Sequence, residues 1–243
     1  MPGHAYAAGV IPRSQSVGRP RRPGAGGALL LAALCVVALA LVWVVAELVP
    51  AAHVRDAVAL HDFVLLDGPH IHAVTKVLLH LLDPLLFTIW GLVLVLIALA
   101  RGRTRVALAV VVVMALAPLS SEVLKPLLAH PHVRIGATRI GPASFPSGHS
   151  TAAAALALCA VLVTPARRRP VVAALAVVFT LAVGVALLIG AWHMPSDVLG
   201  GYLMGVLWIS LAVAGLRASE RRWPSRSRPS RYRDTRGRPA IEG

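Results

Sequence analysis

The sequence predicts an all-α membrane protein with six transmembrane helices. Hydrophobic residues make up 57% of the 243 residues and charged residues 14%, and the mean hydropathy is +0.75, whereas soluble domains average about 45–50% apolar and about 25% charged residues. Apolar runs recur along the chain, and short basic clusters separate them. A formal charge of +14 divided in this way does not form the single basic face that nucleic-acid binding requires, so we expect no nucleic-acid partner.

The apolar runs mark the expected spans, several of which need flanking residues to reach the about 20 residues of a helical crossing. The first run, Gly27 to Val49, exceeds the roughly 7–15 residues of a signal-peptide core, so we interpret it as an uncleaved first helix. Residues 1–26 then form a basic tail, 27–217 the transmembrane domain and 218–243 an arginine-rich tail with too few apolar residues to fold. The expected spans are Ala28 to Leu48, Pro84 to Ala100, Val106 to Ser120, Thr151 to Val163, Val171 to Ile189 and Val198 to Val213.

The segment between the first two spans, residues 49–83, is too polar to cross a membrane. Apolar residues such as Val74, Val77, Leu78 and Leu81 partly keep a helical period, which predicts an amphipathic helix at the interface. The histidines of this segment follow no compact metal-ligand spacing, so we expect no metal and no other cofactor. These histidines are His53, His61, His70, His72 and His80.

The basic residues predict the orientation of the chain. Most of the 24 lysines and arginines fall in the two tails and in the loops Arg101 to Arg105 and Arg167 to Arg169. By the positive-inside rule these segments are cytoplasmic, which predicts a multi-pass protein of the cell membrane with both termini inside. All histidines except His4 then lie on the extracytoplasmic face, where we expect the active site. The basic residues left on that face are Arg55, Lys76, Lys125, Arg134 and Arg139.

Two polar segments stand directly before apolar runs. In the first of them, 193-HMPSD-197, Pro195 suits the first turn of a helix, which leaves His193 just outside it and Asp197 within reach of the imidazole. A carboxylate bonded to one ring nitrogen fixes the tautomer and leaves the other nitrogen free to attack. The pair therefore predicts a nucleophilic histidine with its orienting acid.

The second segment, 146-PSGHS-150, predicts an anion site. Gly148 permits close approach of a ligand to the backbone, and the start of the following helix presents unpaired N–H groups near Ser147 and Gly148. His149 adds a group that donates a proton near neutral pH, and Lys125, after the third span, adds a mobile cation. Glu122, one helical turn before Lys125, is expected to be its ion-pair partner.

Together these residues predict phosphoryl transfer through a phosphohistidine. His193 would attack phosphorus, Lys125 and the backbone at Ser147 and Gly148 would neutralise charge, and His149 would protonate the leaving oxygen and then activate water. A two-metal phosphatase needs several convergent carboxylates, and only Glu122 and Asp197 are near these segments, so we expect a metal-independent reaction.

These residues resemble the type 2 phosphatidic acid phosphatase superfamily, integral membrane phosphatases that include bacterial undecaprenyl diphosphate phosphatases. In that family a lysine is followed by Arg-Pro, then by Pro-Ser-Gly-His, then by Ser-Arg with a later His and Asp. The resemblance covers Glu122 to Asp197. It implies that His193 is the nucleophile and His149 the acid, with a lipid phosphate as substrate. The alanine-, valine- and arginine-rich composition is typical of bacteria with GC-rich genomes, which favours a polyprenyl phosphate or diphosphate.

The chain departs from the family pattern at both arginines. His132-Val133 stands in place of Arg-Pro, and Ala186-Leu187 stands in place of Ser-Arg. Arginine forms strong bidentate contacts with phosphate, so two alternatives follow: an active phosphatase with replacement donors, or a lipid-phosphate-binding protein of the same fold without turnover. The loop that follows Lys125 offers the replacement donors, among which we select Arg134. The others are His130, His132 and Arg139.

Overall fold

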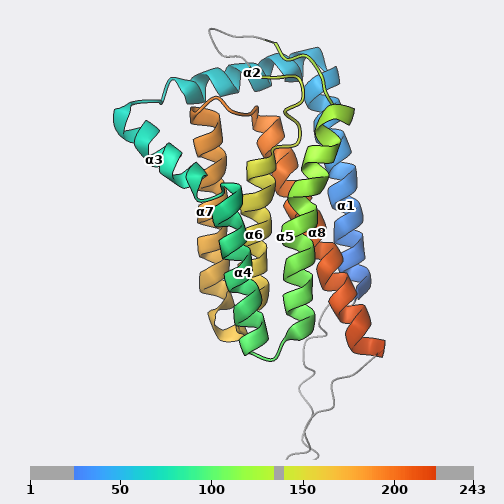
Figure 1. Cartoon of the computed structure of the whole chain (residues 1–243). Coiled ribbons are helices and arrows are strands. Elements are labelled where there is room, and N and C mark those ends of the chain that lie inside the picture. The colour runs from blue at the N-terminus through green and yellow to red at the C-terminus, as the bar shows by residue number, and fades with distance from the viewer. Residues whose placement is uncertain (1–24, 134–139, 223–243) are drawn as a thin grey trace, which may run out of the picture.

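The protein is an all-helical bundle with two helices lying across one end (Figure 1). The structure, a computed structural model, describes residues 25–133 and 140–222, and no strand occurs among them. This confirms the predicted all-α fold. The helices are α1 (Ala25–Trp43), η1 (Val44–Leu48), α2 (Pro50–Val64), α3 (Pro69–His80), α4 (Pro84–Ala100), α5 (Thr104–Leu127), α6 (Gly148–Val163), η2 (Ala166–Arg168), α7 (Arg169–Ile189) and α8 (Pro195–Arg222).

Helix α6 is the centre of the bundle. It packs against α4, α5, α7 and α8, while α1 lies along α8 on the outside. Small side chains make this position possible, because the run Ala152 to Ala155 is buried together with Ala157 and Cys159. The outward-facing residues of the other long helices are mostly large and apolar, as expected of a surface that faces lipid.

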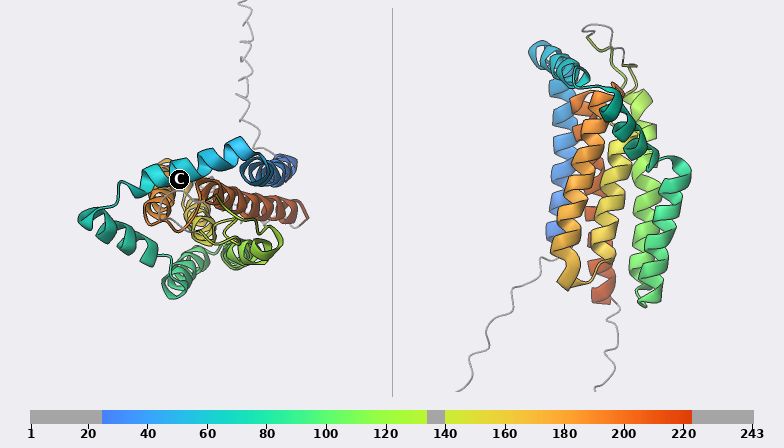
Figure 2. Two further views of the ribbon diagram at one scale, coloured as in Figure 1. Left: turned by 90° about the horizontal axis from the view of Figure 1, so that it is seen from above. Right: turned by 90° about the vertical axis from the view of Figure 1, so that its left-hand side faces the viewer.

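Prolines divide the polar segment between α1 and α4. Helices α2, α3 and α4 each begin with a proline, at Pro50, Pro69 and Pro84. Proline lacks a backbone N–H and has a fixed φ, so it starts a helix readily and seldom continues one. The expected amphipathic segment is therefore present as two helices rather than one, and α3 meets α4 at a bend of 55°. Figure 2 shows both helices crossing the end of the bundle, which we call the capped end.

Among residues 25–133 and 140–222, four helices are long and apolar enough to cross a membrane, or five if α3 and α4 form one bent span. The four are the combined α1 and η1, then α5, then α7 with η2, and α8. Helix α6 has 16 residues and is shorter than the others in the bundle. A multi-pass membrane protein is thus confirmed, and the number of six crossings stays a prediction.

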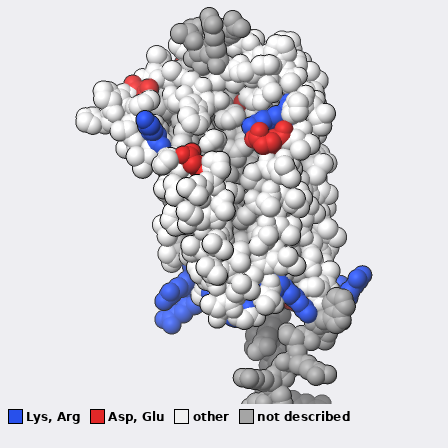
Figure 3. Space-filling view, in the orientation of Figure 1, with Lys and Arg blue, Asp and Glu red and all other residues white. Residues whose placement is uncertain are grey.

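The opposite end of the bundle, which we call the basic end, carries the arginine-rich loops. Arg101 and Arg103 donate hydrogen bonds to the carbonyl of Val163, at 3.0 and 3.1 Å. Guanidinium groups stabilise a helix C-terminus because they satisfy its unpaired carbonyls and oppose the negative end of its dipole. Figure 3 shows basic side chains gathered at this end, which faces away from α2 and α3. The described arginine-rich loops therefore lie together, as the sequence predicts.

Glycines bring α8 directly against α6. A Cβ atom on Gly201 would lie 2.6 Å from the carbonyl oxygen of Ser147, and one on Gly205 would lie 2.5 Å from Cβ of Ala154. Such separations leave no room for a side chain, so the two backbones are in close contact. Small residues allow this kind of helix pairing in membranes.

We expect Gly205→Ala to lower the stability of the protein by about 1–3 kcal/mol, because the added methyl overpacks the α6–α8 contact. Gly215→Ala is the matched control on the same helix: nothing lies within 4 Å of its Cβ position, and the change should be neutral or slightly stabilising. Thermal unfolding of the purified protein in detergent measures both. Equal midpoints for the two variants would contradict the predicted close contact.

Candidate active site

The two polar segments that precede apolar runs meet at the capped end. Helix α6 begins at Gly148 and α8 at Pro195, so His193 stands just outside its helix, as predicted. The backbone N–H of Ser147 donates to the carbonyl oxygen of Asp197 at 2.9 Å. This bond joins the start of α6 to the start of α8 and places both segments at the same depth.

His193 and Asp197 form a buried pair. Nδ1 of His193 lies 3.3 Å from Oδ2 of Asp197, and the same oxygen accepts a hydrogen bond from the backbone N–H of Met194 at 2.9 Å. Asp197 is fully buried. A carboxylate at Nδ1 places the ring hydrogen on that nitrogen, which leaves Nε2 with a free lone pair. The geometry is that of an oriented nucleophile.

The chain reaches His193 through a tight turn that ends α7. Ala191 has φ of 54°, in the left-handed region, and the N–H of Trp192 bonds back to the carbonyl of Leu187 at 3.0 Å. This is the Schellman arrangement that ends many helices, here with alanine in the position where glycine is usual. The turn directs Trp192 and His193 toward the start of α6.

Lys125 lies beside the first residue of α6. Its Nζ is 2.6 Å from Oε1 of Glu122, which confirms the predicted ion pair. A Cβ atom on Gly148 would lie 2.7 Å from that carboxylate oxygen and 3.6 Å from Nζ of Lys125. Gly148 therefore leaves the space that the ion pair occupies, and the structure brings Lys125 and Gly148 together as predicted.

Ser147 is buried and serves the helix start. Its hydroxyl oxygen accepts from the N–H of Ser150 at 3.3 Å, which is an N-cap bond, while its own N–H is bonded to Asp197. The loop before it is held by Ser121, whose hydroxyl donates to the carbonyl of Pro146 at 2.8 Å. These bonds make Ser147 a fixed point of the loop that carries Gly148 and His149.

His149 stands at the mouth of α6, before the apolar run that starts at Thr151. Its ring packs edge-to-face on Trp192 with centroids 5.4 Å apart. Burial lowers the pKa of His149 below its usual value, and repulsion by His193 and Lys125 lowers it further. The contact with Trp192, which precedes His193, and the position next to Gly148 place His149 near both His193 and Lys125.

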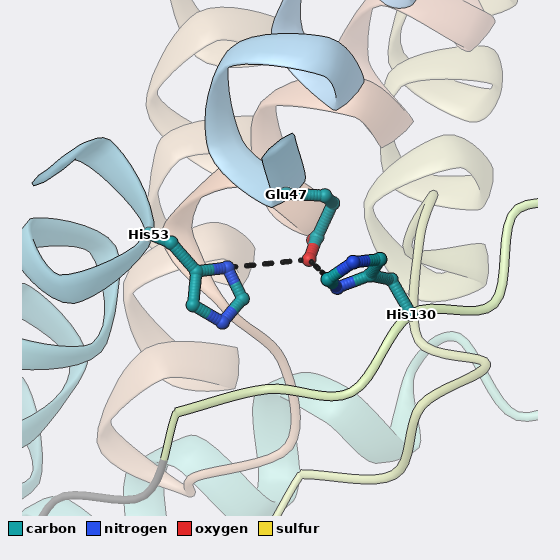
Figure 4. Close-up of side chains that lie close together, drawn as sticks. All are labelled: Glu47, His53 and His130. Atoms are coloured by element: carbon teal, nitrogen blue, oxygen red, sulfur yellow. Dashed lines mark ion pairs between the residues drawn. The ribbon is translucent and has the colours of Figure 1, made fainter. Parts of the chain in front are cut away.

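A second polar cluster lies behind the site. Oε2 of Glu47, at the end of η1, is 3.4 Å from Nδ1 of His53 and of His130 (Figure 4). The same oxygen is 3.6 Å from Nδ1 of His132. Nε2 of His132 also lies 2.8 Å from the hydroxyl of Ser144. Desolvation lowers the pKa of His132, which is almost fully buried. Sequence reasoning missed Glu47, since it ends an apolar run and its partners His130 and His132 are distant in the sequence.

The cluster contains a ligand set for a metal ion, but His53 does not fit that use. Glu47, His53 and His130 offer ligand atoms within 4.8 Å of one another. However, Nε2 of His53 accepts from the N–H of Val133 at 2.9 Å, so the ring hydrogen is on Nδ1, which faces the carbonyl of Ala46 at 2.9 Å. An Nδ1–H cannot coordinate a metal. The cluster is a hydrogen-bonded link between η1, α2 and the segment after α5.

Asp56 is a further, half-buried acid that the sequence did not single out. Its Oδ1 accepts from the N–H of Ser196 at 3.1 Å and its Oδ2 from the hydroxyl of Ser196 at 2.6 Å. Burial raises the pKa of Asp56, and the bonds from Ser196 act against that rise. Because Ser196 precedes Asp197, this contact caps α8 with a residue of α2 and fixes the start of the helix next to His193.

The match to a protein-family model decides the family. Residues 106–221, which include Lys125 and both polar segments, match the model described as the PAP2 superfamily.

The chain belongs to the PAP2 superfamily, which is the type 2 phosphatidic acid phosphatase superfamily.

A solved structure of another PAP2 protein has a similar fold. It is the first transmembrane PAP2 type phosphatidylglycerolphosphate phosphatase from Bacillus subtilis, with a TM-score of 0.64 and 22% sequence identity over 79% of this chain and 98% of that one. At this identity the likeness concerns the fold. No curated protein matches the chain by sequence.

The structure shows what occupies the two arginine positions of the PAP2 pattern. His132 takes the first and is held by Glu47 and Ser144. Leu187 takes the second and is fully buried in the hydrophobic core of α7. Of the replacement donors, His130 also faces Glu47, whereas Arg134 and Arg139 lie outside the described residues. The described donors near the site are therefore Lys125 and the start of α6.

We expect Asp56→Ala to destabilise the protein by about 2–4 kcal/mol, because it removes two charge-assisted hydrogen bonds from the start of α8. Asp62→Ala is the control, since Asp62 is exposed on the same helix. Thermal unfolding in detergent compares the two. Wild-type stability in Asp56→Ala would show that α2 does not fix α8.

Proposed function

We propose that the protein is a metal-independent phosphatase that removes a phosphate from a lipid phosphate or diphosphate in the membrane. The observation that carries this proposal is the His193–Asp197 pair, in which Asp197 orients Nδ1 of the imidazole. The pair lies at the capped end, close to His149 and Lys125. Membership of the PAP2 superfamily supports the same reaction class. A polyprenyl carrier is the substrate that we favour among these lipids.

The proposed reaction has two displacements at phosphorus. Nε2 of His193 attacks, the bond between phosphorus and the lipid oxygen breaks, and His149 gives its proton to that oxygen. Water then attacks the phosphorus of the phosphohistidine, and His149 takes up a proton from that water. The bond between phosphorus and Nε2 of His193 breaks, and phosphate leaves. Lys125 and the backbone at Gly148 balance the charge on the phosphoryl oxygens, and Asp197 stabilises the His193 ring as it becomes positive.

Supporting residues keep these groups in place. Ser147 holds the loop of α6 against Asp197, and Glu122 holds Lys125 near Gly148. We keep Arg134 in the proposal as a phosphate donor, because it lies in the same loop as His132 and matches the charge that the PAP2 pattern supplies there. Substitution of Arg134, measured in the same hydrolysis assay as the His193 variant, would test this contact.

We expect His193→Ala to abolish hydrolysis of a polyprenyl phosphate and diphosphate, with wild-type activity unchanged by a chelator. The control is His70→Ala, at an exposed position on α3, which should retain full activity. Brief reaction with ³²P-labelled substrate should trap an acid-labile phosphohistidine in wild type and none in His193→Ala. Full activity of the His193 variant would refute the mechanism.

A second function has a specific observation in its favour. Because His132 and Leu187 replace the family arginines, a lipid-phosphate-binding protein without turnover fits the same site. The trapping experiment separates the two. Binding of labelled lipid with neither product nor trapped intermediate favours the binding protein, whereas product in the presence of chelator favours the phosphatase.

We also propose that the capped end faces outside and that both termini are cytoplasmic, with residues 27–217 as the membrane domain between the tails 1–26 and 218–243. The arginines at the basic end support this orientation. A phosphatase reporter that is active only outside the cytoplasm, fused after Gly243, should be inactive, and a reporter fused in the loop between α2 and α3 should be active. The reverse pattern would overturn the orientation.

A further inference from the structure

A pocket of about 660 Å³ lies under α3, next to the candidate site. Its lining is amphiphilic: α3 contributes both apolar and charged side chains, and the turn before α8 closes the other side. The titratable and aromatic side chains of the lining are Asp67, His72, Lys76, His80, Asp83 and Trp192. None of them is the proposed nucleophile, and none belongs to the predicted anion site at Ser147 and Gly148.

The pocket shares a wall with His149. Trp192 lines the pocket and packs its ring edge-to-face on the ring of His149, at 5.4 Å between centroids. Asp83, another lining residue, acts electrostatically on His149. The pocket therefore begins beside His149, on the side away from α5, which carries Lys125 (Figure 1).

The position of His149 determines which part of the substrate enters the pocket, if the proposed function holds. In the proposed reaction His149 gives its proton to the oxygen that leaves phosphorus. The leaving group must then extend from His149, and the adjacent space under α3 is this pocket. A lipid alcohol has both a polar end and an apolar chain, which suits a lining of mixed character.

Lys76 is the charged group in the pocket that is left to contact a ligand. The two carboxylates are each engaged by an imidazole: Asp67 by Nδ1 of His72 at 3.5 Å, and Asp83 by Nδ1 of His80. Among the described residues, Lys76 has no ion pair or side-chain hydrogen bond, and its side chain is exposed. An ammonium in this position provides three donors to an anionic group.

We propose that this pocket binds the leaving group of the substrate and that Lys76 favours a leaving group with a second phosphate, as in a lipid diphosphate. Cleavage of the phosphoanhydride bond between the terminal phosphorus and the bridging oxygen would then release a lipid monophosphate. Its former bridging oxygen takes the proton of His149 while its phosphate contacts Lys76. A lipid monophosphate has no such group, and its hydrolysis does not depend on Lys76. The inference rests on the proposed function and narrows its substrate.

The test compares two substrates with the same lipid. Initial rates are measured for a polyprenyl diphosphate and the matching monophosphate in detergent, for wild type, Lys76→Met and Lys76→Arg. Loss of one charge-assisted contact should lower kcat/KM of Lys76→Met for the diphosphate about tenfold, and leave the monophosphate within about twofold. Lys76→Arg should restore most of the diphosphate activity. Arg55→Met, at an exposed cation on α2 that does not line the pocket, should behave as wild type.

Each outcome has one meaning. A fall limited to the diphosphate supports the inference, and an equal change for both substrates, or none, refutes it while the proposed phosphatase stands. The same fall in Arg55→Met would assign the effect to general surface charge and would also refute it. If wild type cleaves neither lipid, although it remains folded in detergent, the proposed function itself fails.

Discussion

The contact between α6 and α8 is the interaction on which the candidate site depends. The two polar segments are more than forty positions apart in the sequence, and they meet because Gly201 and Gly205 let α8 approach α6 without intervening side chains. The backbone bond from Ser147 to Asp197 exists only at this separation. Without this close approach, His193 and His149 would lie at the ends of two separate helices and could not act on one ligand.

The capping helices extend this constraint to the outer surface. Asp56 of α2 bonds to Ser196, and the Glu47 cluster joins η1 and α2 to the segment that follows α5. Since that segment leads into the PSGH loop, the link through His130 bears on the start of α6 as well. Two contacts thus fix the start of α8: the bond from Ser147, the N-cap of α6, to Asp197, and the bond from Ser196 to Asp56 of α2.

The sequence predicted those parts of the site that depend on local chemistry. A proline, a histidine and a carboxylate in HMPSD specify a helix start with an oriented imidazole, and the structure has both. The helical period of the apolar residues in 49–83 does not by itself reveal the break between α2 and α3, which lies where Pro69 starts a new helix. Glu47 escaped the prediction for a different reason: its partner His130 is 83 positions away, and only the folded chain brings them together.

The ion pair between Glu122 and Lys125 bears on how the proposed site would bind phosphate without the family arginines. Glu122 places a carboxylate oxygen against Gly148, where the start of α6 would receive an anion. This carboxylate therefore occupies part of the predicted anion site. The side chain of Glu122 is 59% exposed, and exposed ion pairs contribute only about 0–1 kcal/mol. A phosphate that makes charge-assisted bonds to Lys125 gains more than this. In the free protein Glu122 keeps Lys125 beside Gly148, and in the proposed reaction it would give up this position to the substrate at little cost.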